Sequence, residues 1–246
     1  MAYAFRVYAP TTSGSTIDTS GNPPAAGEVL IVWSVSDNSS TTGVGPGAGW
    51  TQINSAWQST TTDAQSLGVW IKNTAAAGGE TSIDVTTSSV NLNGAMAISG
   101  VNATTFQDVT APAPTNNNTG QSSVATITNS ITPTTNGSLI VAIKGTDTTA
   151  STDATHTFSG GGLTWTTRAD QQDGFRNVGV GTAEQATAAA ITVTGSSSFA
   201  TGTAGQAMFI LALRNASPPT GGSAAVSGSA VTGGTGSFPP GTSIGL

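Results

Sequence analysis

The sequence predicts an all-β protein: an antiparallel β-sandwich of jelly-roll type, built from two internal repeats and followed by an extended C-terminal arm. Three observations support this fold class. The 246 residues include 43 Thr, 29 Ser and 32 Gly but only 18 charged residues, so hydroxyls and amides must cover most of the surface. Apolar residues stand in short runs between clusters of turn-forming Gly, Asn, Asp and Pro. A similar series of runs occurs twice along the chain, which is typical of a repeated structural unit.

The strongest strand prediction is Val29–Val35, a run rich in β-branched and aromatic residues. Such a run is typical of a central strand that is covered on both faces. Leu67–Lys72 alternates in the manner of a half-buried strand, and Ile83–Val85 and Ile191–Val193 do the same. Thr182–Ala190 is the one stretch compatible with a helical turn. We expect about ten to twelve strands, antiparallel because so many connections are short.

Internal similarity connects the two parts of the chain. Pro23–Asp37 resembles Pro133–Asp147, which lies 110 positions later. Further blocks recur in the same order at slightly different spacings: Leu67–Val69 with Val178–Val180, Ile83–Ser89 with Ile191–Ser197, Ala95–Ile98 with Ala207–Ile210, and Trp50 with Trp165. Loop insertions between retained strands would produce this drift. We therefore expect one repeat at about residues 11–101 and another at about 121–214, with Ile83 equivalent to Ile191 and Met96 equivalent to Met208, all buried.

Two arrangements of these repeats are compatible with the sequence. The halves could pair into a single pseudo-two-fold sandwich of jelly-roll type, or each could close its own small sandwich as one of two tandem domains. We favour a single sandwich over residues 1–214. The join between the repeats contains a strand candidate of its own, Ser123–Thr128, and no long charged or Pro-dense hinge. Each half alone is also poor in large apolar side chains.

The composition changes after Arg214. Residues 215–246 carry no charged side chain and contain two Pro-Pro pairs. Such a segment cannot offset its ordering entropy alone, so we expect an extended arm that is held by a partner. Its widely spaced apolar residues are the predicted partner-binding residues: Val226, Val231, Phe238, Ile244 and Leu246.

Catalytic and metal-binding motifs are sparse. The chain has no Cys, which excludes disulfides and thiolate chemistry, and His156 is its single histidine. A Ser-His-acid arrangement needs one histidine, but no nucleophile-elbow motif accompanies His156, so we expect a structural or surface residue. Calcium could use Asp147 with Asp153, or Asp170 with Asp173, although no D-x-D-x-D spacing is present. We predict no catalytic residues, no cofactor and no metal, and hence no enzyme.

Charge and hydropathy limit the partners. The net charge is −6, and six scattered cations cannot form a phosphate-binding stripe, so we expect no nucleic-acid partner. No apolar run of 18 residues and no leader pattern occur, so we expect no membrane insertion. Trp57 and Trp70 lack aromatic counterparts in the second repeat. They could stack on a glycan or fill an interface, although core packing is the favoured alternative.

The repeated pattern resembles a family of Ser/Thr/Gly-rich β-sandwich proteins with two half-repeats, encoded by tailed bacteriophages and environmental bacteria. The resemblance covers about residues 15–214. It is carried by Pro24–Val35, Gly49-Trp50, Gly78–Ile83 and Gly94–Val101, and again by Asn136–Ile143, Thr164-Trp165 and Gly205–Leu213. It implies a virion decoration, fibre or surface-adhesion module without catalytic residues.

Two functions follow as expectations. The first is a non-enzymatic virion structural protein of capsid decoration or fibre type. Such a protein would be a homo-oligomer, docked partly through its arm on capsid or tail subunits. The alternative is an extracellular carbohydrate-binding or adhesive module at a cell surface, with a host-surface glycan as its partner.

Overall fold

A computed structural model describes residues 2–12, 16–36, 46–54, 57–58, 66–72, 78–85, 91–102, 104–148 and 153–216. Within these residues the protein consists of strands, turns and bends without a helix, and every strand pairing is antiparallel. The chain divides into two units, Met1–Ala216 and Ser217–Leu246. The predicted arm residues Val226, Val231, Phe238, Ile244 and Leu246 belong to the second unit and lie outside the described residues.

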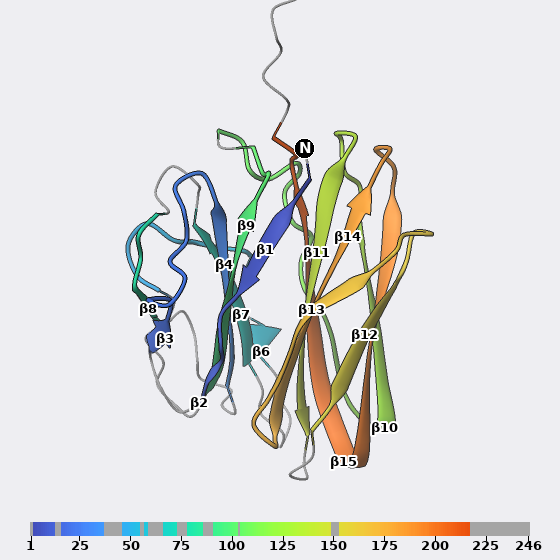
Figure 1. The fold of residues 1–246 in the computed structure, drawn as a ribbon. Coiled ribbons are helices and arrows are strands. Elements are labelled where there is room, and N and C mark those ends of the chain that lie inside the picture. Colours follow the sequence, from blue (N-terminus) through green and yellow to red (C-terminus); the bar gives the residue numbers. More distant parts are fainter. Residues whose placement is uncertain are drawn as a thin grey trace, which may run out of the picture. The chain divides into compact units, whose positions relative to one another are not determined.

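The first half of the chain forms a sheet in the order β1-β9-β4-β7-β5, with β2 paired to β9 and β6 paired to β7. A separate two-stranded ribbon joins β3 to β8 (Figure 1). The bounds of these strands are β1 Ala4–Val7, β2 Thr11–Thr12, β3 Thr16–Asp18, β4 Val29–Ser36, β5 Thr51–Gln52, β6 Trp57–Gln58, β7 Ser66–Lys72, β8 Ser82–Asp84 and β9 Asn91–Ser99.

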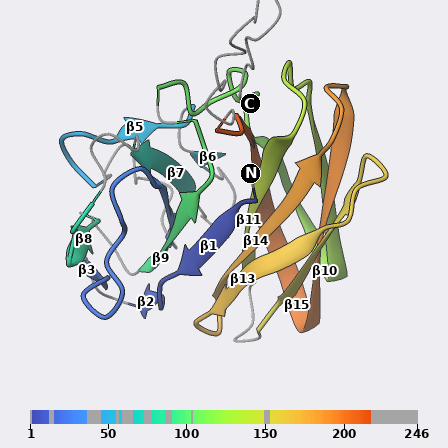
Figure 2. The ribbon, with the colours of Figure 1, turned by 45° about the horizontal axis from the view of Figure 1, so that its top comes forward.

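The second half forms a sheet in the order β10-β15-β11-β14-β13, with β12 paired to the first part of β15. Figure 2 shows its two longest strands, β10 and β15, running alongside each other. The bounds are β10 Thr115–Ile131, β11 Ser138–Thr148, β12 Thr155–Gly160, β13 Thr166–Gln172, β14 Arg176–Gln185 and β15 Ile191–Leu213.

The central strands β4 and β11 are buried on both faces. An inner apolar core contains residues of both sheets, among them Ile31 and Trp33 of β4, Val141 of β11 and Leu211 of β15. The opposite face of the first sheet packs with the β3–β8 ribbon in a second core, the outer core of this half, which contains Leu30, Val32, Ile17 and Ile83. The opposite face of the second sheet has an outer core of its own, which contains Ile140, Ala142, Ile131 and Ile191. Consequently every residue of β4 is buried, and the prediction that Val29–Val35 is covered on both faces is confirmed.

The expected equivalence of the methionines is wrong. Met96 lies in the inner core, whereas Met208 lies in the outer core of the second sheet. The strand registers explain the difference. Leu30 corresponds to Ile140 in the repeat, so their partners Ala97 and Ala212, which are 115 positions apart, correspond to each other as well. Met96 and Met208 are only 112 positions apart, and this odd difference of three residues places their side chains on opposite faces of the strand. Ile83 and Ile191 are both buried, each in the outer core of its own half.

Two other local predictions differ from the structure. Thr182–Ala190 contains no helical turn, because β14 continues through Gln185 and pairs there with Ser138. Strand β7 is buried from Ser66 to Ile71 rather than on one face only, since the ring of Trp70 is also covered. The described residues form fifteen strands rather than ten to twelve, and several of them have only two or three residues. The described residues include no helix that is long and apolar enough to cross a membrane.

We predict that the shared inner core makes unit Met1–Ala216 unfold in one transition. Ile31→Ala removes a fully buried side chain from that core, and the resulting cavity should lower the free energy of unfolding by about 2–5 kcal/mol. Val124→Ala, at a 54% exposed position of β10, should change it by less than about 0.5 kcal/mol. Urea unfolding followed by tryptophan fluorescence and far-UV circular dichroism measures both. Two separate transitions, only one of them shifted by Ile31→Ala, would contradict the shared core.

Candidate functional site

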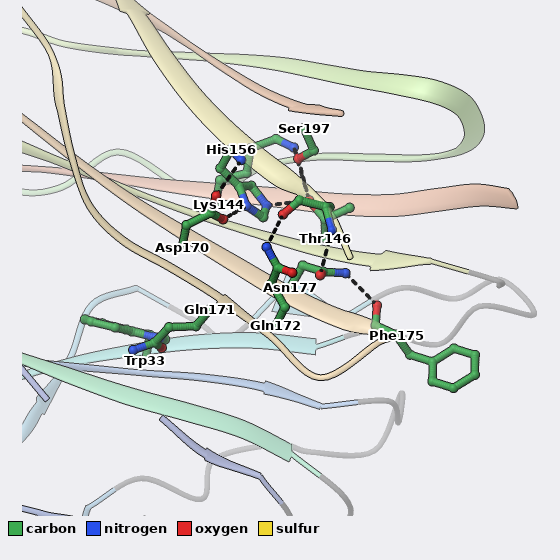
Figure 3. A network of polar contacts seen from close by, with 11 residues as sticks. Trp33, Lys144, Thr146, His156, Asp170, Gln171, Gln172, Phe175, Asn177 and Ser197 are labelled. Carbon is green, nitrogen blue, oxygen red and sulfur yellow. Dashed lines mark hydrogen bonds and ion pairs between the residues drawn. The ribbon is translucent and has the colours of Figure 1, made fainter. Parts of the chain in front are cut away.

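A cluster of polar side chains lies inside the second half of the protein (Figure 3). Lys144 and Thr146 belong to β11, His156 to β12, Asp170 to β13 and Ser197 to β15. Side chains alternate between the faces of a strand, so Lys144 and Thr146 share the face of Ala142, which belongs to the outer core of this half. The apolar run of β11 therefore ends in two polar groups that point into the interior.

Hydrogen bonds connect this cluster into a continuous chain. His156 Nδ1 lies 2.8 Å from Asp170 Oδ1, and the backbone N–H of His156 donates to Asp170 Oδ2 over 3.2 Å. On the other side of the ring, His156 Nε2 lies 3.2 Å from Thr146 Oγ1. Thr146 Oγ1 lies 2.7 Å from Ser197 Oγ and accepts from Lys144 Nζ over 3.1 Å. Lys144 also donates to Ser197. We call Asp170, His156, Thr146, Ser197 and Lys144 the interior relay.

Two glycines make room for the interior relay. A Cβ at Gly179 of β14 would fall far inside van der Waals distance of the His156 side chain. A Cβ at Gly195 of β15 would lie 2.9 Å from Lys144 Cδ. Close packing rather than backbone conformation therefore favours glycine at both positions, most strongly at Gly179, where an added Cβ would meet the Cβ of His156.

Further hydrogen bonds fix the chain just before β12. The backbone N–H of Ala154 donates to Asn177 Oδ1 over 2.9 Å, and Gln172 Nε2 donates to the Ala154 carbonyl over 3.3 Å. Asn177 Nδ2 in turn donates to the Phe175 carbonyl over 3.0 Å. These contacts, drawn in Figure 3, hold β12 against β13 and β14, and so hold the imidazole in place.

Burial sets the charge state of the two bases. Desolvation lowers the pKa of Lys144 from its ordinary 10.5 to about 7. Desolvation also lowers the pKa of His156, as does the charge of Lys144, against the opposing effect of Asp170. The imidazole is therefore neutral at pH 7. Because Asp170 accepts from Nδ1, the lone pair of Nε2 faces the Thr146 hydroxyl.

The interior relay has the order of acid, imidazole and hydroxyl that activates a nucleophile, but it is closed to outside substrates. His156 is 2% exposed, and Lys144 and Ser197 are fully buried. Of the two alternatives predicted for His156, a structural residue agrees with its buried position, and a surface residue is wrong. Sequence reasoning missed Lys144, Thr146 and Ser197. The available signal was Lys144, a charged residue at a position of an apolar run that faces the interior.

A surface hollow lies elsewhere in the second half. It has a volume of about 350 Å³, and its lining includes Thr166, Arg168, Thr182 and Glu184. Arg168 Nε donates to Thr182 Oγ1 over 2.8 Å, and the Arg168 guanidinium lies 3.8 Å from the centre of the Phe5 ring. No residue of the interior relay lines this hollow.

Of the two tryptophans predicted for a glycan or an interface, the structure describes the side chain of Trp70. Trp70 is 7% exposed and packs in the outer core of the first half, which agrees with the core-packing alternative. Trp57 lies in β6, and its side chain is outside the described residues. Trp33 is buried, and its Nε1 donates to Gln171 Oε1 over 3.0 Å, which joins the first sheet to β13 (Figure 3).

The carboxylates considered for calcium have other partners. Asp170 binds His156, and Asp173 forms a 2.6 Å ion pair with Arg176. Asp147 is buried at the end of β11, opposite Arg176 in the strand register. Among the described residues no group of three or more His, Asp or Glu side chains is placed to hold a metal ion.

We predict that Gly179→Ala disrupts the site by overpacking. The added methyl group has no space beside His156, so β12 must move and stability should fall by about 1–3 kcal/mol or more. Gly21→Ala is the matched control, because a Cβ there meets nothing within 4 Å. Thermal unfolding of both variants measures the difference. Equal melting temperatures for the two variants would contradict the close packing of β12 on β14.

We also predict that stability rises with pH above neutrality. In the unfolded chain Lys144 keeps its proton up to about pH 10.5, whereas in the folded protein it loses that proton above about pH 7. The unfolded state then binds more protons, so the free energy of unfolding should rise between these pH values by up to about 1.4 kcal/mol per pH unit. Denaturant unfolding at several pH values measures this slope. Lys144→Met should abolish it, and Lys72→Met, near the surface beside Glu80, should keep it. An unchanged slope in Lys144→Met would show that Lys144 is not its source.

Comparison with known proteins gives no relative. No protein-family model, curated protein or solved structure matches the chain. The resemblance to proteins of tailed phages and environmental bacteria therefore stays a prediction.

Proposed function

We propose that this chain is a non-enzymatic structural protein, which presents a rigid β-structure within a larger extracellular assembly. The observation that carries this proposal is the enclosure of the interior relay. Its acid, imidazole and hydroxyl groups lie in the core, where they connect β11, β12, β13 and β15 instead of facing a substrate cleft. Groups used in this way stabilise the structure and do not turn over an external substrate.

The assembly that the sequence resemblance favours is a bacteriophage virion, with the protein as a capsid decoration or fibre. Low charge supports a place in an assembly, because only 7% of the residues are charged and little repulsion keeps copies apart. The proposed partners are capsid or tail subunits and further copies of the chain. Residues 215–246 are the proposed docking arm.

We further propose that the two halves are repeats of one jelly-roll-type unit. Each main sheet has a central path of five strands. When these five are numbered in chain order, both paths run 1-5-2-4-3, with β4 and β11 at the centre. Ile17 is opposite Ile83 in the first half, and Ile131 is opposite Ile191 in the second. Trp50 and Trp165 pack against the outer cores of their own halves, which also supports the equivalence.

Carbohydrate binding at a cell surface is the second candidate function. One observation favours it, namely the hollow beside Arg168 and Glu184. Several threonine hydroxyls, a guanidinium and a carboxylate converge there with small apolar side chains, and such a mixture suits the hydroxyl groups of a saccharide. A host-surface glycan would then be the partner.

The proposed function predicts that the full chain is multimeric and that residues 1–216 alone are not. Light scattering over a wide concentration range measures both masses, and thermal unfolding should give the same melting temperature for both. The same melting temperature is expected because the inner and outer cores lie within residues 1–216. A monomeric full chain would argue against an assembly protein. If this monomer bound immobilised cell-surface glycans, carbohydrate binding would be favoured instead.

A further inference from the structure

We propose that Thr146 and Gln206 become joined by an intramolecular ester bond, which the interior relay itself forms. The two residues are direct cross-strand partners in the register of β11 and β15. Gln206 is fully buried, and it shares its strand face with Met208 and Ile210 of the outer core. Directly opposite residues of an antiparallel pair have Cβ atoms about 4.5–5.5 Å apart. The Thr146 and Gln206 side chains thus leave the sheet from adjacent positions on the same face.

The surroundings of Thr146 supply what its hydroxyl needs to react. His156 Nε2 lies 3.2 Å from Thr146 Oγ1, and Asp170 holds the other ring nitrogen at 2.8 Å. A neutral imidazole that is oriented by a carboxylate is the usual general base for a hydroxyl nucleophile. Lys144 Nζ, 3.1 Å from Thr146 Oγ1, can donate to the oxyanion of the tetrahedral intermediate.

The carboxamide is also held in place. Gln206 Nε2 donates to the Thr126 carbonyl over 3.2 Å. Thr126 is opposite Ser196 in the register of β10 and β15, so this hydrogen bond directs the amide toward the segment of β15 that contains Ser197. The electrophile of the proposed reaction is therefore positioned as well as its nucleophile.

The reaction balances without an added reagent. Thr146 Oγ attacks Gln206 Cδ, and His156 takes the hydroxyl proton. The tetrahedral intermediate collapses with cleavage of the Cδ–Nε2 bond, and His156 returns the proton to the departing nitrogen. The products are an ester between the two side chains and one molecule of ammonia. No oxidation or reduction occurs.

Burial and composition both favour this linkage. The core excludes the water that would hydrolyse an ester. The chain has no cysteine, so an ester between its long central strands would be its covalent crosslink. The inference goes beyond the proposed structural function, because a non-crosslinked protein could also serve in an assembly.

The first half contains an internal control. Ser36 of β4 and Asn91 of β9 are buried cross-strand partners, so a hydroxyl again lies opposite a carboxamide. Ser36 Oγ lies 2.7 Å from Ser66 Oγ, but His156 is the single histidine of the chain. This pair therefore has no imidazole base, and we expect one crosslink in the protein rather than two.

Mass spectrometry of the full chain tests the inference. After incubation at neutral pH, the intact protein should be lighter than its sequence mass by one ammonia. Trypsin cleaves after Lys144, Arg168, Arg176 and Arg214 and separates residues 145–168 from 177–214. These two peptides should stay joined, and alkaline hydroxylamine should separate them because it cleaves esters and leaves amides intact.

Two variants and one control complete the experiment. Thr146→Val and Asp170→Asn should retain the full sequence mass or lose ammonia far more slowly, with folding checked by circular dichroism. Ser36→Ala should lose one ammonia like the unaltered protein. An unaltered protein at full sequence mass with two separate peptides overturns the inference, even if the variants fail to fold. Blocked cleavage after Lys144 with a hydroxylamine-resistant link would also overturn it, because the bond would then be an amide of Lys144.

Discussion

Burial of both faces of each main sheet is the constraint on which the rest of the structure depends. Strands β4 and β11 are buried along their whole length, so each sheet needs a cover on either side. The sheets cover each other through the inner core, while the β3–β8 ribbon and the strands around β12 supply the outer layers. The outer layers also explain two glycines of β7 and β14, the strands next to β4 and β11. In the second half Phe158 lies over Gly181, and in the first half the Trp70 ring folds back over Gly68.

Polar groups inside such a layered protein must find partners within the chain, because an unpaired buried group is costly. Trp33 meets Gln171 across the inner core, and Tyr3 donates to the Gly137 carbonyl over 2.7 Å. Asp108 accepts hydrogen bonds from Thr134 and Thr135, which hold the turn between β10 and β11, and these bonds lower its pKa against the opposing effect of desolvation. The interior relay is the most elaborate case of this arrangement. Its hydrogen bonds select one register for β11, β12 and β15.

Sequence patterns predicted local structure well and long-range arrangement only in part. The apolar run Val29–Val35 and the paired positions Ile83 and Ile191 were evident because strand periodicity is a local signal. The methionine spacing misled, since a shift of an odd number of residues changes the strand face without changing the apparent similarity. The interior relay could not be predicted, because β12 reaches β14 and β15 only after the chain has folded back. His156 and Ser197 are 41 positions apart in sequence and opposite each other in the sheet.

The pairing of first and last strands within each half has a consequence for synthesis. Strand β1 can pair only after β9 has been synthesised, and β10 can pair only after β15 has been synthesised. Contacts of such large sequence separation form slowly. During synthesis the sheet of the first half can therefore form before the second half has been translated. Its inner face, however, stays exposed to solvent until β11 and β15 have been made. During this interval the nascent chain exposes the apolar inner face of one complete sheet. Neighbouring nascent chains could then associate wrongly through these faces.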